Sequence, residues 1–222
     1  MDGGRMKCRN VIVVLFVFFT AVACSQPAYP YSAGETYSIM NGNANEEMRV
    51  VENNNKAGNI FLHEKAMKVP YGAVTNRLIE RMQKTVSVEK GVGIAAPQVG
   101  ISRQLVLVQR FDRAGKPFFA CLNPIVKQMS KETKKGWEGC LSVPAGFGEV
   151  VRSKELTIVC HNADGVAKEE TISGFTAVIF QHELDHLNGV LFVDRMNKNE
   201  SLIPKDEYRK MRKKKAPHPE KK

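Results

Sequence analysis

The sequence predicts an α+β protein, with strands gathered in the middle of the chain and a helix on either side of them. Apolar residues repeat at helical spacing over about 72–89 and again over about 174–188, and the segments between them have strand-like patterns. Strands grouped in this way indicate an α+β domain rather than a βαβ sheet. At 222 residues the chain can bury one sizeable core and is short for two domains.

The net charge of +10 belongs mainly to the two ends of the chain. Residues 1–24 carry +2 and residues 205–222 carry +6, which leaves +2 for everything between them. A basic face across the body is therefore not predicted, and we expect no specific DNA binding. The basic tail, 205–222, is expected to be a solvated end, with ribosomal RNA or an anionic membrane surface as the alternative partners.

Residues 1–24 have the pattern of an export signal. Three basic residues precede a thirteen-residue apolar run, 11–23, whose helix would be about 20 Å long and therefore too short for a hydrocarbon core of about 30 Å. The run ends in Ala21-Val22-Ala23-Cys24, which is similar to the lipobox of bacterial lipoproteins. If Met1 is the true start and Cys24 is lipidated, we expect a protein anchored to the cell envelope. If the start codon lies further downstream, we expect a cytoplasmic protein.

Between this signal and the tail we expect a tether and one globular domain. Residues 25–59 are rich in Pro, Gly and Asn and have little apolar periodicity, which is typical of a flexible tether. The globular domain is placed at 60–204. Its first helix should end at Gly91, where 91–93 form a bend. Strands are then predicted at 104–109, 118–122, 125–129, 149–152, 156–161 and 166–172, the last two joined by a turn at 162–165.

The second helix carries a metal-binding pattern. His182 and His186 are four residues apart on its apolar face, so both imidazoles can reach one ion. Glu183 lies beside the first of them, where it can accept a proton from a water molecule on the metal. A third ligand is needed, and the residues alone leave it open. The candidates are His63, His161, His218, the carboxylates and the cysteines, among them Cys140 in a segment flanked by Gly and Pro.

A third feature is the Gly-rich segment 91–98. Its glycines allow another chain to approach the backbone closely, and Gln98 offers an amide donor. A phosphate-binding loop should follow a strand and open a helix, and this segment does neither. Its small residues suit a substrate that lies along the chain.

Together, Gly91-Val92-Gly93-Ile94-Ala95-Ala96-Pro97-Gln98, Glu138-Gly139-Cys140-Leu141-Ser142 and Gln181-His182-Glu183-Leu184-Asp185-His186 resemble the three motifs of peptide deformylases, in the same order. The similarity spans about 72–196. It implies antiparallel sheets packed around a metal-bearing central helix, with 60–204 as the catalytic domain. It also implies hydrolysis of the formyl group from N-formylmethionine at the start of new polypeptides. N-formylmethionyl peptides are then the partners, and we expect a monomer.

The resemblance also implies roles for individual residues. Matched by position, the metal ligands are Cys140, His182 and His186, with water as the fourth ligand. Glu183 matches the catalytic acid and base, while Gln98 and the Leu141 backbone N–H match the donors to the oxyanion. Gly93 matches the residue whose backbone meets the substrate. Val92 and Val178 match positions that line the methionine pocket of the family, with a place in the plain core as the alternative for each. The family implies Fe²⁺, one ion per chain, and the donor set is also compatible with Zn²⁺, Ni²⁺ or Co²⁺.

One position departs from the family pattern. After Val143-Pro144 the family usually has an aromatic residue or Gln followed by Arg, whereas Gly146-Phe147 stands here. The remaining cysteines of the globular domain, Cys121 and Cys160, lie in predicted strands. We expect them to be buried thiols rather than a disulfide.

Two other functions compete with deformylation. A zinc endopeptidase would use the same helix with a ligand further along the chain, but only His218 follows and Cys140 would be left without a role. A lipoprotein with the deformylase fold and no catalytic activity would fit the export signal, because formylated nascent chains belong to the cytosol.

Overall fold

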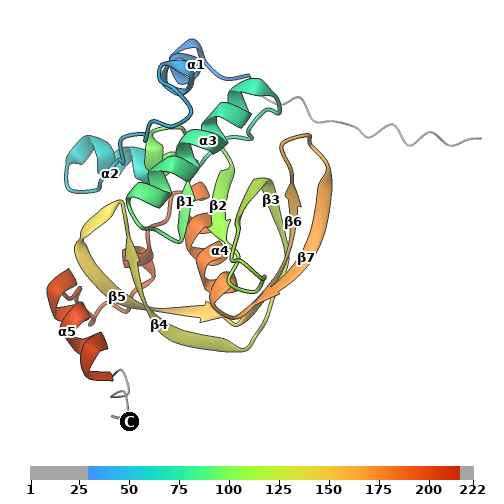
Figure 1. Cartoon of the computed structure of the whole chain (residues 1–222). Helices are drawn as coiled ribbons and strands as arrows, with labels where there is room; N and C mark the ends of the chain where they lie inside the picture. Colours follow the sequence, from blue (N-terminus) through green and yellow to red (C-terminus); the bar gives the residue numbers. More distant parts are fainter. Residues whose placement is uncertain (1–29, 216–222) are drawn as a thin grey trace, which may run out of the picture.

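The computed structural model describes residues 30–215, so the predicted signal segment with Cys24, and also His218, lie outside the described residues. Seven strands form a five-stranded antiparallel sheet in the order β1-β2-β3-β6-β7 and a separate β4–β5 hairpin (Figure 1). Their bounds are β1 Gly93–Ala95, β2 Leu105–Gln109, β3 Phe118–Met129, β4 Thr133–Cys140, β5 Val143–Ser153, β6 Glu155–His161 and β7 Ala167–Ser173. No helix among the described residues is long and apolar enough to cross a bilayer.

Helix α4, Gly174–Leu187, lies between the sheet and the hairpin (Figure 1). Its buried residues Ile179, Phe180 and Leu184 form one hydrophobic cluster with Val106 and Val108 of β2. The α+β fold with antiparallel sheets around a central helix is therefore confirmed. This helix has buried residues all round, because the sheet covers one side and the hairpin covers the other.

Helix α3, Ala73–Val88, covers the opposite face of the sheet, close to its predicted span of 72–89. Leu78 and Met82 are fully buried against Leu105 and Leu107. Because successive side chains of a strand point to opposite faces, β2 contributes residues to both clusters. This two-sided burial explains the continuous apolar run in the sequence at this strand.

Several strands differ from the sequence-based expectation. The two strands predicted at 118–122 and 125–129 form one strand, β3, whose register shifts between Leu122 and Ile125, where Asn123 has a φ of 47°. Strand β4 was not predicted, because its lysines and glycines lack an apolar pattern, and β5 is much longer than the predicted 149–152. The bend at 91–93 leads into a short strand, β1, that pairs with β2.

The flexible tether predicted at 25–59 is wrong for its described part, 30–59. This part contains helix α1, Ala33–Met40, and most of helix α2, Lys56–Leu62. Ile39 and Met48 are buried beneath α3, and Glu35 forms an ion pair of 2.7 Å with the buried Arg103. These few anchors are far apart in the sequence, so they produce no periodicity. The other predicted domain boundaries stay predictions.

The described part of the basic tail forms helix α5, Lys205–Lys215, after a short 3₁₀ turn at Phe192–Arg195. Tyr208 stacks on Phe147 at a ring distance of 4.1 Å and lies 5.8 Å from Trp137. Phe147, at the position that departs from the motif pattern noted above, therefore packs against the C-terminal helix. The basic side chains described on α5 remain exposed.

The expectation of two thiols at positions 121 and 160 is also wrong, because Cys121 and Cys160 form a disulfide between β3 and β6. Their Cα atoms are 4.9 Å apart, within the range that a disulfide requires. The two cysteines are 39 residues apart, and only the pairing of β3 with β6 brings them together. Cys140 is the one free cysteine among the described residues.

Candidate metal centre

Three side chains that could bind one metal ion meet between β4 and α4. Cys140 ends β4, and His182 and His186 lie one helical turn apart on α4. One ligand atom from each lies within 4.8 Å of the others, and Cys140 Sγ is 3.2 Å from His186 Nε2. A thiolate and two imidazoles suit a transition metal, and three protein ligands leave a position for water or substrate.

The other histidines that the structure describes have different partners. His63 contacts the Asn59 carbonyl at 2.7 Å and Asp194 at 3.2 Å, and His161 contacts the Leu122 carbonyl. Of the candidates that the sequence left open for a third ligand, Cys140 is the one that lies with His182 and His186 in a group that could hold a metal ion, among the residues that the structure describes. Cys140 precedes helix α4 in the sequence. The zinc endopeptidase alternative would need a ligand that follows this helix.

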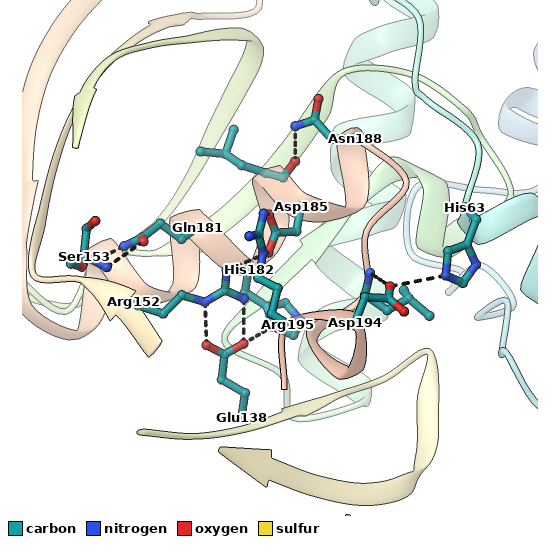
Figure 2. A network of polar contacts seen from close by, with 12 residues as sticks. His63, Glu138, Arg152, Ser153, Gln181, His182, Asp185, Asn188, Asp194 and Arg195 are labelled. Atoms are coloured by element: carbon teal, nitrogen blue, oxygen red, sulfur yellow. Dashed lines mark hydrogen bonds and ion pairs between the residues drawn. The ribbon is translucent and has the colours of Figure 1, made fainter. Parts of the chain in front are cut away.

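A buried carboxylate orients His182 (Figure 2). Glu138 Oε2 lies 2.8 Å from His182 Nδ1, and Arg152 donates to both oxygens of Glu138 at 2.7 and 2.9 Å. Burial alone would raise the pKa of Glu138, but the hydrogen bonds from Arg152 and His182 outweigh it and lower the pKa to about 2. The ionised carboxylate can only accept, so Nδ1 of His182 carries the proton and Nε2 is left for a metal.

Arg152 connects three elements around this centre (Figure 2). From β5 it binds Glu138 on β4 and also donates to Asp185 on α4 at 2.6 Å. Asp185 in turn accepts from Arg195. Glu138 and Asp185 lie within the sequence motifs, but no role was predicted for them there, and Arg152 and Arg195 were not predicted to belong to the site. The two acidic residues in the motifs were the only sign in the sequence of this network of ion pairs. Nothing in the sequence marks the two arginines as their partners.

Glu183 is buried at the same centre, with 3% of its surface exposed. Its Oε2 has no hydrogen-bond partner among the described residues, and burial raises its pKa to about 7. Gly93 on β1 runs directly against it, since a Cβ at position 93 would lie 2.4 Å from Glu183 Oε1 and 2.7 Å from Ile179 Cγ2. Only glycine fits there without moving Glu183.

The amide of Gln98 points to the same place. Its Oε1 accepts from the Ala95 N–H at 2.8 Å, which leaves Nε2 directed at Cys140 Sγ, 3.4 Å away. The residue sits in a short 3₁₀ turn, Ala96–Val99, directly after β1. Leu141 follows Cys140 at the tip of the β4–β5 hairpin. The structure therefore brings Gln98 and Leu141 together around the Cys-His-His group.

A cavity of about 1060 Å³ opens between the β4–β5 hairpin and the start of α4. Glu138, Val150, Phe175 and Val178 are among the residues that line it. Of the two predicted methionine-pocket residues, Val178 lies on this lining. Val92 does not, and it packs against the core beside α4.

A model of the family described as polypeptide deformylase matches residues 49–201. The chain belongs to this family. Over 147 residues it is 40% identical to the peptide deformylase of Thermotoga neapolitana, covering 66% of this chain and 87% of the relative. Over 162 residues it is 38% identical to peptide deformylase 2 of Nostoc sp., covering 69% and 90%.

Solved deformylase structures share the fold. The crystal structure of the Thermotoga maritima peptide deformylase aligns with a TM-score of 0.62 and 37% identity, covering 68% of this chain and 99% of that one. A Met-Ala-Ser-bound structure of a class I type b deformylase from Acinetobacter baumannii aligns with a TM-score of 0.62 and 33% identity, covering 68% and 98%. This chain is thus a deformylase-family hydrolase that acts on N-formylmethionine, and its family is metal-dependent.

Proposed function

We propose that this chain deformylates N-formylmethionyl peptides with one Fe²⁺ ion bound by Cys140, His182 and His186. The observation that carries this proposal is the meeting of these three donors beside a buried carboxylate, Glu183, that has an oxygen without a partner. A divalent ion held by these three residues would lower the pKa of a water molecule and polarise a carbonyl oxygen.

Glu183 moves the proton in this proposal. Because burial brings its pKa to about 7, its carboxylate can take a proton from the attacking water and return it to the leaving amine of methionine. The side chain is enclosed by Gly93 and Ile179, so bulk water has little access to it.

Gln98 and Leu141 act on the formyl oxygen. Gln98 Nε2 and the Leu141 backbone N–H donate to this oxygen as negative charge develops on it, and the loss of one such donor typically lowers the rate by about 10²–10³. The backbone of Gly93 lies along the substrate, and the cavity at Val178 receives the methionine side chain. Val92 does not line this cavity and packs instead against the core cluster that contains Ala177 and Ile179 of α4.

The test is release of formate from formyl-Met-Ala-Ser. The Glu183→Ala variant is expected to keep the metal and lose hydrolysis, so unchanged turnover would contradict its role. Cys140→Ala is expected to lose the metal, whereas the matched variant His161→Ala should retain it, because His161 contacts the Leu122 carbonyl and the Tyr71 ring and none of the three proposed ligands. Elemental analysis of protein purified without oxygen should find iron, and zinc or nickel alone would exclude Fe²⁺ as the native ion.

We also propose that the chain is exported and anchored at Cys24. The buried Cys121–Cys160 disulfide supports this, because disulfides persist in oxidising compartments and are rare in the cytosol. Alkylation of thiols in intact producing cells, followed by fractionation and mass spectrometry, tests the proposal. We expect an envelope protein whose first residue is a lipidated Cys24 and whose disulfide is formed. A soluble chain with reduced Cys121 and Cys160 would contradict it.

Helix α5 is proposed as a contact for an anionic partner, ribosomal RNA or an anionic membrane. Its Lys210, Arg212, Lys213 and Lys214 are exposed and form no ion pair with a described residue. Binding to purified ribosomes or to anionic vesicles should weaken as salt rises, because counterions are released. Equal binding by a Lys213→Glu/Lys214→Glu variant would contradict the proposal. In light scattering we expect a monomer.

A further inference from the structure

Residues 48–53 connect the two segments that carry Gln98 and Leu141. The Val51 N–H donates to the Gln98 carbonyl at 2.8 Å, and the Asn53 N–H donates to the Ser142 carbonyl at 2.9 Å. The sequence placed these residues in a tether, but they run between the 3₁₀ turn after β1 and the tip of the β4–β5 hairpin. The two segments are far apart in the sequence, and the 48–53 segment makes a backbone hydrogen bond to each of them.

The 48–53 segment is itself fixed at both ends. The Met48 N–H donates to Thr85 Oγ1 of α3 at 2.8 Å, and the Met48 side chain is 7% exposed. Just beyond the other end, Asn55 caps α2 by accepting from the Gly58 N–H at 2.9 Å. Val51 packs into the same apolar cluster as Cys140. The segment therefore has little freedom to follow a displacement of either partner.

These bonds determine where the two donors can lie. The Gln98 side chain is already oriented by its bond with the Ala95 N–H, so the bond from Val51 adds control over the position of its backbone. The bond from Asn53 fixes the carbonyl of Ser142, directly after Leu141. Two donors can serve one oxygen only if each lies about 2.7–3.1 Å from it.

We propose that the 48–53 segment is a positioning element, which holds Gln98 and Leu141 at the separation that lets both donate to one formyl oxygen. This inference rests on the proposed function. Since the donors act on charge that develops in the transition state, a displaced donor lowers kcat and leaves KM nearly unchanged. The segment touches neither the reacting atoms nor the metal ligands through hydrogen bonds.

Proline substitutions test this role, because proline removes the N–H. Residues 53 and 54 form a turn, whose first central position accepts proline, and the Asn53 side chain is only half-buried. Asn53→Pro is expected to lower kcat about tenfold or more, with KM and metal content close to those of the wild type. Glu52→Pro is the matched control, because the Glu52 N–H donates to no described residue, and it should retain the wild-type kcat.

Val51→Pro adds a coupling test. It should lower kcat when Gln98 is present and have no further effect in a Gln98→Ala background, because the donor that it positions is then absent. Asn53→Pro should still lower kcat in that background, since it acts through Leu141.

Three results would overturn the proposal: an unchanged kcat in Asn53→Pro, an equal loss in Glu52→Pro, or an equal loss from Val51→Pro with and without Gln98. Unfolding of both Asn53→Pro and Val51→Pro would also overturn it, since the role would then be structural. If the wild-type chain releases no formate, the proposed function fails instead. The two failures are thus distinguishable.

Discussion

Removal of the Cys121–Cys160 disulfide is expected to lower the free energy of unfolding by about 4 kcal/mol. The cross-link closes a loop between residues 39 apart. The loop-closure relation gives an entropy of about −13 cal/mol/K for a loop of this length, which is about 4 kcal/mol at 25 °C. Cys121 and Cys160 are 0% and 4% exposed, so a Cys121→Ala/Cys160→Ala variant also loses some packing.

Urea unfolding measures this difference. Trp137 is the single tryptophan and lies on β4, away from the disulfide, so its fluorescence reports on the fold as a whole. The variant should unfold at lower urea, and its m-value should rise because the unfolded chain without the cross-link exposes more surface. Wild type with the disulfide reduced keeps both sulfur atoms, so its midpoint should fall between the other two. Equal midpoints for all three proteins would refute the reasoning.

Three further outcomes are expected. Gly93→Ala should lower kcat at least about tenfold with the metal retained, because its Cβ would displace the Glu183 carboxylate, and an unchanged formate assay would contradict this. Arg152→Met leaves the buried Glu138 carboxylate without its cation, while Asp185 keeps Arg195, so we expect about 3–5 kcal/mol of destabilisation and about 10–100-fold weaker metal binding in chelator competition. Burial raises the pKa of Glu170, but bonds from Lys168, Arg110 and Arg113 lower it to about 2. Because the pKa of Glu170 is lower in the folded protein, its ionised carboxylate stabilises the fold above about pH 4.5. The loss of stability in Glu170→Gln should therefore be full at pH 7 and shrink as the pH falls toward 2. A loss of stability that does not change with pH would contradict this.

The metal-bearing helix was predictable because its pattern is local. The spacing of His182 and His186 is the spacing of one helical turn, and α4 follows from the apolar positions around them. Cys140 could be named only through the resemblance of its motif, since nothing local distinguishes it from a buried thiol. Its approach to His186 depends on strand β4, which has no apolar pattern of its own.

The features that sequence analysis missed depend on contacts between distant residues. Arg152 is an ordinary arginine in a strand until the fold brings Glu138 and Asp185 to it. The disulfide depends in the same way on the pairing of β3 with β6. The tether was predicted from composition, but the buried Ile39, the ion pair of Glu35 with Arg103 and the hydrogen bonds from Arg81 to the end of α1 are among the contacts that join this segment to the domain.

The central claim is that the Cys-His-His centre, with Glu183 beside it, hydrolyses the formyl amide. The most direct measurement is incubation of the metal-loaded full chain with formyl-Met-Ala-Ser, with formate and peptide products quantified together. Equal amounts of formate and intact Met-Ala-Ser are predicted, and the Glu183→Ala protein should produce neither. Cleavage of peptide bonds without formate, or no formate from protein that has its metal bound, would contradict the claim.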